Sequence, residues 1–197
     1  MEKEFFIKIA EKCEKERVRL VLDECFVQFL ASGEKASMQS EVERFSYLFV
    51  LQAFTKIYAV PGIRLGYGIS SNKALLERME TVRQPWSVST PAQAAGLAAL
   101  KEDHREEQTR QLVKSERERM EKELENLRIE YIPSEANFLL FNSKINWFEE
   151  LKKRGILIRD CADYRGLGNG WYRIAVRLPE ENDRLLECMK QVLNERS

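Results

Sequence analysis

The stretch FSYLFVLQAFTKIYAVPGIRLGY, residues 45–67, decides the fold of this 197-residue chain. It opens with a continuous apolar run, which is typical of a strand buried on both faces of a parallel sheet. The run leads to Lys56, and Arg64 follows in the next turn. A second apolar run, residues 18–23, ends at Asp23. We therefore expect an acid and a lysine at the carboxyl ends of neighbouring strands, where open α/β sheets bind ligands.

These residue types suit pyridoxal 5'-phosphate (PLP), an electron sink that a lysine holds as a Schiff base while an acid faces its pyridine nitrogen. An acid such as Asp23 keeps that nitrogen protonated, and a lysine such as Lys56 becomes a nucleophile when its surroundings lower its pKa. Arg64 offers a planar, permanently charged fork for the phosphate. Simpler interpretations stay open: Asp23 could cap a helix, Arg64 could pair with a surface carboxylate, and Lys56 could be an ordinary solvated lysine.

Three segments in this order resemble the class I/II aminotransferases, which are fold-type-I PLP enzymes. The segment AFTKIYAVPGIRLG, residues 53–66, looks like their lysine motif, and LVLDECF, residues 20–26, resembles their acid motif. Near the C-terminus, WYRIAVR, residues 171–177, resembles the segment that holds the substrate carboxylate. The histidinol-phosphate aminotransferase and threonine-phosphate decarboxylase branch is the most similar, because residues 158–170, IRDCADYRGLGNG, resemble the decarboxylase version.

The resemblance implies a role for each matched residue. It makes Lys56 the catalytic lysine, and the full set of expected site residues is Asp23, Thr55, Lys56 and Arg64 for the cofactor and Asn137, Arg159 and Arg173 for the substrate. Arg177 competes with Arg173 for the substrate carboxylate, and Tyr164 is expected to assist Arg159. Two positions depart from the family pattern: Ala53 replaces a hydroxyl residue that contacts the cofactor phosphate, and Phe26 replaces a tyrosine found in many aminotransferases.

The implied function is a PLP-dependent reaction of an amino acid or a phosphorylated amino acid. Transamination and decarboxylation both remain open, because the orientation of the substrate decides which bond breaks. Family members are about twice as long, so the chain is expected to be a C-terminal portion without the segments that cradle the cofactor phosphate on a helix N-terminus. An alternative from another class is therefore a catalytically silent fragment or scaffold that does not hold PLP.

The expected fold class is α/β, with part of a PLP-transferase large domain, mostly parallel in its sheet, over residues 1–90. A linking helix and a small α+β domain are expected over residues 91–197. The hydrophobic periodicity predicts helices at 4–16, 72–82, 101–127, 147–154 and 179–194, and strands at 18–23, 45–51, 65–70, 136–141, 156–160 and 171–177.

The composition of the chain argues against several classes of protein. Basic and acidic residues number 32 each, which gives no electrostatic case for nucleic acid or an anionic membrane. No apolar stretch approaches the ~18 residues of a membrane span. The four cysteines and single histidine form no metal-binding spacing, so no metal site is expected, and the thiols suggest a reduced, cytoplasmic protein. By resemblance we expect a small-molecule amino acid substrate and a homodimer.

Overall fold

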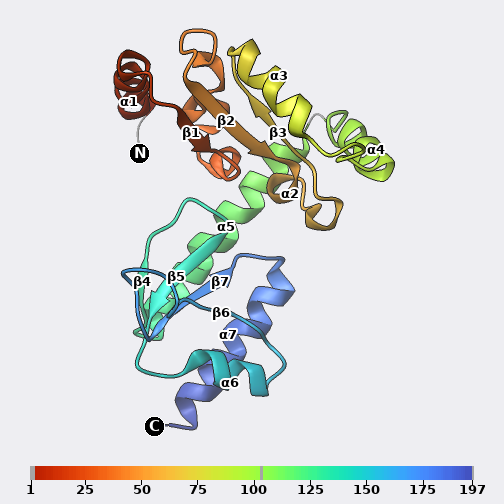
Figure 1. Cartoon of the computed structure of the whole chain (residues 1–197). Coiled ribbons are helices and arrows are strands. Elements are labelled where there is room, and N and C mark those ends of the chain that lie inside the picture. The colour runs from red at the N-terminus through yellow and green to blue at the C-terminus, as the bar shows by residue number, and fades with distance from the viewer. Residues whose placement is uncertain (1–2, 103, 197) are drawn as a thin grey trace. The chain divides into compact units, whose positions relative to one another are not determined.

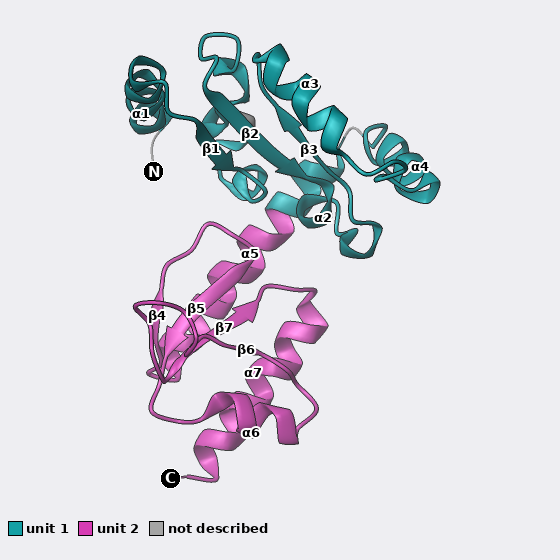
Figure 2. Cartoon of the chain, in the orientation of Figure 1, with its two compact units in different colours: residues 1–110 teal, residues 111–197 magenta. Residues whose placement is uncertain are grey.

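The computed structural model describes residues 3–102 and 104–196. The chain divides into two compact units, residues 1–110 and residues 111–197 (Figure 2). The division lies within one long helix, α5 (Arg105–Asn126), which contributes to both units. The sequence analysis placed a domain boundary between residues 90 and 91, about 20 residues before the division between the two units. That domain boundary stays a prediction.

The first unit contains a three-stranded sheet with the order β1-β2-β3 (Figure 1). Its strands are β1 (Leu20–Asp23), β2 (Leu48–Ala53) and β3 (Gly66–Ile69). The pair β1 and β2 is parallel, as expected, whereas β3 runs antiparallel to β2. The β2–β3 connection holds only two short helical segments, α2 (Phe54–Ile57) and η4 (Pro61–Ile63), and lacks the longer crossover that parallel pairing requires. The α/β fold class is confirmed, and this antiparallel edge is a feature that the sequence pattern did not indicate.

One face of this sheet forms the core of the first unit. The buried cluster combines Leu48 and Val50 of β2 with Ala10 of α1 (Lys3–Glu16) and with Met38, Val42 and Phe45 from the β1–β2 connection. Leu20 and Leu22 pack against this cluster. The residues that alternate with them, Val21 and Asp23, are exposed because side chains along a strand point to opposite faces. Asp23 therefore lies on the open face of the sheet.

Two helices complete the first unit after β3. They are α3 (Lys73–Val82) and α4 (Thr90–Ala99), and each begins at a side chain that accepts a backbone hydrogen bond. Asn72 Oδ1 accepts from Leu75 N at 2.9 Å, and Ser89 Oγ accepts from Ala92 N at 3.3 Å. Such caps satisfy amide groups that have no partner within the helix, which fixes where each helix starts.

The second unit is an antiparallel sheet with two helices. The strand order is β4-β5-β7-β6, and the strands are β4 (Glu130–Ile132), β5 (Phe138–Asn142), β6 (Arg159–Asp160) and β7 (Trp171–Ala175). The two helices are α6 (Trp147–Lys153) and α7 (Pro179–Asn194). Trp147, Phe141, Leu139 and Met189 are fully buried. The sequence analysis missed β4, because three residues are too few to show alternation, and the predicted strand at 156–160 is reduced to two residues.

A buried polar network joins α5 to the start of α7 within the second unit. Glu116 Oε2 accepts hydrogen bonds from Asn182 Nδ2 and from Arg119 Nη2, both at 2.7 Å. Asn182 Oδ1 also accepts from Arg177 N at 3.0 Å. The hydrogen bond from Arg119 is the main cause that lowers the pKa of Glu116, and burial opposes it. The network therefore favours the ionised carboxylate in the folded chain.

Among the described residues, no helix combines the length and the apolar character that a membrane span requires.

The buried leucine of β5 provides a test of the core. Replacing Leu139, which has 0% of its surface exposed, by alanine should lower the free energy of unfolding by about 2–5 kcal/mol, because a cavity remains. The matched change Leu157→Ala, at a side chain that is 74% exposed, should cost about 0.5 kcal/mol or less. Urea unfolding followed by tryptophan fluorescence measures both values, and equal losses would contradict this core.

The Glu116 network should depend on pH. Because the folded-state pKa of Glu116 is lowered, its stabilising contribution is complete above the unfolded pKa and disappears as the pH falls through the folded value. Glu116→Gln should therefore cost about 1–3 kcal/mol at neutral pH and progressively less in acid. Glu118→Gln, at an exposed position of α5 two residues beyond Glu116, is the control and should show no such pH dependence. Urea unfolding across the acid range checks the sign.

Candidate functional site

Asp23 and Lys56 lie at the same edge of the first unit's sheet. Asp23 is the last residue of β1 and pairs in register with Leu51 of β2. Lys56 follows in α2, which begins directly after β2 ends. Because β1 and β2 are parallel, their carboxyl ends meet at one edge, and this is the edge at which open α/β sheets bind ligands. The structure thus brings the predicted acid and the predicted lysine together.

The charges of these two residues interact. Asp23 Oδ1 accepts a hydrogen bond from Cys25 N at 3.0 Å. The pKa of Asp23 is lowered, first by hydrogen bonding to the Cys25 side chain, then by this backbone bond and by the positive charge of Lys56. Burial, together with the hydrogen bond and charge of Asp23, raises the pKa of Cys25 to about 11, while Lys56 opposes the rise. The edge therefore presents an ionised carboxylate and a neutral thiol near an amine.

An aromatic ring lies beside the amine of Lys56. The Nζ atom is 5.3 Å from the centroid of the Phe26 ring, a cation–π geometry. Phe26 also packs in a tilted arrangement against Phe29, which is buried. The end of β1 thus supplies the carboxylate, and the turn that follows supplies a ring that contacts the lysine.

Thr55 and Arg64, the other two expected cofactor residues, lie in the β2–β3 connection. Thr55 is half-buried in α2, next to Lys56. Arg64 is exposed and has a left-handed backbone conformation with φ of 58° at the end of η4. Its Nη1 donates to Pro61 O at 3.0 Å, and within the described residues no carboxylate forms an ion pair with it. Its guanidinium therefore faces solvent and is not occupied by a surface acid.

Glu24 joins the two strand ends, and the sequence analysis did not single it out. Its Oε2 accepts from Ser37 Oγ at 2.5 Å and from Gln52 Nε2 at 3.0 Å, and its Oε1 accepts from Met38 N at 2.8 Å. These three donors come from the β1–β2 connection and from β2 itself. No local pattern could identify them, because Glu24 is separated from its partners by 13 to 28 residues. The network fixes the turn after β1 relative to β2.

The expected substrate residues form a separate group in the second unit. Arg159 of β6 and Arg173 of β7 are direct cross-strand partners. The Arg159 guanidinium lies 5.5 Å from the Tyr164 ring centroid and binds Asp163 Oδ2 at 2.5 Å. Arg173 lies over the Phe138 ring at 5.2 Å. The structure therefore brings together two arginines that are far apart in the sequence.

Asn137 and Arg177 lie outside the strands that hold this arginine pair together. Asn137 is half-buried immediately before β5, and its backbone oxygen accepts from Val176 N at 2.8 Å. Arg177, the competing candidate for the carboxylate, lies beyond the end of β7 and pairs with Glu181 at 2.8 Å. Arg177 is thus engaged by α7, whereas Arg173 remains in the strand beside Arg159.

Metal ligands were also sought. Among the residues that the structure describes, no three histidine, cysteine or acidic side chains lie close enough to hold a metal ion.

Comparisons with known proteins identify the family. The family model of the class I and II aminotransferases matches residues 1–188. The threonine-phosphate decarboxylase of Salmonella typhimurium is 34% identical over 189 residues, which cover 94% of this chain and 51% of that protein. The chain spans about half the length of the curated relatives it matches.

Solved structures show the same fold. The histidinol-phosphate aminotransferase from Clostridium acetobutylicum matches with a TM-score of 0.92 and 31% identity, covering 99% of this chain and 60% of that one. The enzyme of that name from Sinorhizobium meliloti, solved in complex with pyridoxal-5'-phosphate, shares the fold with a TM-score of 0.79 and 21% identity, covering 95% and 54% of the two chains. On the extent of these matches, the chain belongs to the class I and II aminotransferase family.

Proposed function

We propose that this chain carries the lysine-bearing part of a PLP-dependent enzyme that acts on an amino acid or a phosphorylated amino acid, as histidinol-phosphate aminotransferases and threonine-phosphate decarboxylases do. The observation that carries the proposal is the shared strand edge of Asp23 and Lys56, where hydrogen bonding to Cys25 and, to a smaller extent, the charge of the amine lower the pKa of the carboxyl group. An acid and an amine in one place suit the two ends of a pyridine aldehyde.

The residues present fit such a cofactor. Asp23 remains ionised because Cys25 donates to it, so it can hold a proton on the pyridine nitrogen. Lys56 supplies the amine that holds the aldehyde end, and the exposed Arg64 and the neighbouring Thr55 supply donors for the phosphate. When bound, PLP would supply an electron sink for the bond that breaks at the substrate's Cα.

The chain's own residues would bind the substrate and transfer its proton. Lys56 would serve as the base that takes the α-proton of the substrate in a transamination. Arg173 is proposed to bind the substrate carboxylate, because it is not engaged by α7 as Arg177 is. Arg159, with Tyr164, is proposed to bind a substrate phosphate, and Asn137 to contact the substrate. Cytoplasmic location and a homodimer remain part of the same proposal.

A second candidate function is a silent scaffold that keeps the family's motifs without holding PLP. The specific observation that favours it is Ala53, which lacks the hydroxyl expected at that position. Cofactor binding separates the two candidates.

The first test adds PLP to the chain. We expect a visible absorption band that Lys56→Ala abolishes and that Lys73→Ala, at an exposed lysine of α3, retains. Borohydride reduction followed by peptide mass spectrometry should locate the pyridoxyl group on Lys56, because its amine is beside the acid that orients the ring. No band in the unaltered chain would favour the silent scaffold, and a label confined to another lysine would refute the assigned role of Lys56.

A second test addresses the carboxylate without the cofactor. Because Asp23 helps to raise the pKa of Cys25 to about 11, Asp23→Asn should lower that pKa and speed alkylation of Cys25 by iodoacetamide. A decrease of half a pKa unit corresponds to a rate about threefold higher below the pKa. Peptide mass spectrometry across a pH series measures the rate, with Cys13 as the internal reference and Glu16→Gln as the control. An unchanged profile would contradict the contact between Asp23 and Cys25.

A further inference from the structure

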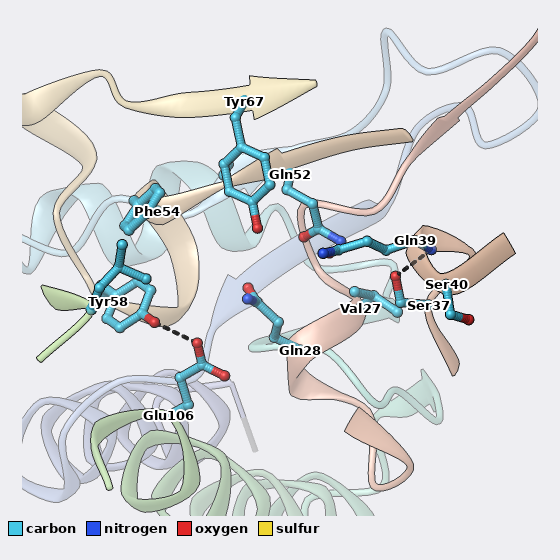
Figure 3. A pocket seen from close by; sticks show the side chains of 12 residues that line it. Val27, Gln28, Ser37, Gln39, Ser40, Gln52, Phe54, Tyr58, Tyr67 and Glu106 are labelled. Carbon is cyan, nitrogen blue, oxygen red and sulfur yellow. Dashed lines mark hydrogen bonds between the residues drawn. The ribbon is translucent and has the colours of Figure 1, made fainter. Parts of the chain in front are cut away.

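The first unit contains a pocket whose lining includes Ala53 but none of the proposed cofactor residues Asp23, Thr55, Lys56 and Arg64. Its volume is about 350 Å³, and its walls come from the turn after β1, the β1–β2 connection, the ends of β2 and β3, and the start of α5 (Figure 3). Gln52 and Tyr67, which line it, are cross-strand partners. Gln52 alternates with Leu51, the register partner of Asp23, so the pocket lies on the opposite face of the sheet from Asp23.

Two buried amide oxygens in this pocket have no hydrogen-bond partner among the described residues. Gln52 is 5% exposed, and its Nε2 donates to Glu24, which leaves Oε1 without a donor. Gln28 Oε1 is buried and unpaired as well. Figure 3 shows both amide ends and the Tyr67 hydroxyl directed toward the middle of the pocket. A buried acceptor without a donor costs about 1–3 kcal/mol, so the pocket favours an occupant that donates hydrogen bonds.

The pocket is also negatively charged. Its lining contains Glu106 and no lysine or arginine. Glu106 Oε1 accepts from Tyr58 Oη at 2.5 Å, and this hydrogen bond from a neutral hydroxyl leaves the carboxylate its negative charge. Among the nearby cations, Lys3 pairs with Glu41 at 3.1 Å and Arg110 pairs with Glu107, while Lys35 and Arg110 line a neighbouring pocket together with Glu106. The charge of the pocket therefore selects against anions.

Three aromatic rings form one wall. Phe54 stacks on Tyr58 with ring centroids 5.2 Å apart and meets Tyr67 edge-on at 5.9 Å. Such rings accept an alkyl chain on their apolar surface and attract a cation to their faces.

We propose that this pocket binds a small organic cation of the alkylammonium class. The ammonium group would donate to Gln28 Oε1, Gln52 Oε1 and the Glu106 carboxylate, which are acceptors that an ammonium with three N–H groups satisfies. The alkyl chain would lie along Phe54, Tyr58 and Tyr67. The volume is within the range of small-molecule sites, and Lys56 is not among the groups proposed to bind the cation.

The test compares three four-carbon probes on the unaltered chain by isothermal titration calorimetry at matched ionic strength. We expect n-butylammonium chloride to bind saturably with a Kd on the order of 1 mM, and n-butanol and sodium butyrate to bind at least ~tenfold more weakly. Equal binding of the alcohol or the carboxylate would overturn the proposal. So would an absence of saturable ammonium binding up to about 50 mM, which would mean that water alone occupies the pocket.

Two variants locate the binding site. Glu106→Gln removes the charge but keeps an acceptor for Tyr58, and Gln28→Leu removes one unpaired oxygen without touching Glu24. Each should weaken n-butylammonium binding about tenfold, the equivalent of one charge-assisted hydrogen bond. Glu77→Gln, at an exposed position of α3, is the matched control and should bind as the unaltered chain does. Unchanged affinity in both folded pocket variants, checked by circular dichroism, would refute this location.

Discussion

The parallel pairing of β1 with β2 is the interaction on which both the first unit's core and its chemistry depend. It buries Leu48 and Val50 against α1 on one face, and it makes the carboxyl ends of the two strands meet at one edge. Glu24 strengthens this junction, because its carboxylate takes hydrogen bonds from Ser37, Met38 and Gln52. Without that pairing, Asp23 and Lys56 would have no common surface.

Alternation along the strands gives the two faces of this short sheet different chemistry. Asp23 points to the open face, near the lysine that follows β2. Gln52, offset by one residue from the register partner of Asp23, points to the opposite face and lines an acidic, aromatic pocket. A one-residue offset is enough to separate a candidate cofactor site from a candidate cation site, because successive side chains of a strand leave the backbone in opposite directions.

Hydrophobic periodicity predicts the long elements of the fold correctly and predicts the short elements poorly. The helices α1 and α7 match the predicted ranges to within one residue, since each repeats its apolar face over several turns. The strand β4 has three residues, which are too few for a period to be visible, and only two residues of the strand predicted at 156–160 form β6. The antiparallel direction of β3 was also beyond the pattern, because alternation is the same in either direction.

The sequence by itself determined the family motifs and the strand ends that carry Asp23 and Lys56, because these depend on neighbouring residues along the chain. Only the tertiary structure decided which distant groups meet. It placed Glu24 against Gln52 and aligned Arg159 with Arg173. It also enclosed the pocket around Gln28, Gln52 and Glu106. Hydrogen bonds and ion pairs between residues far apart in sequence form only after the strands pair and the helices pack, so no local pattern encodes them.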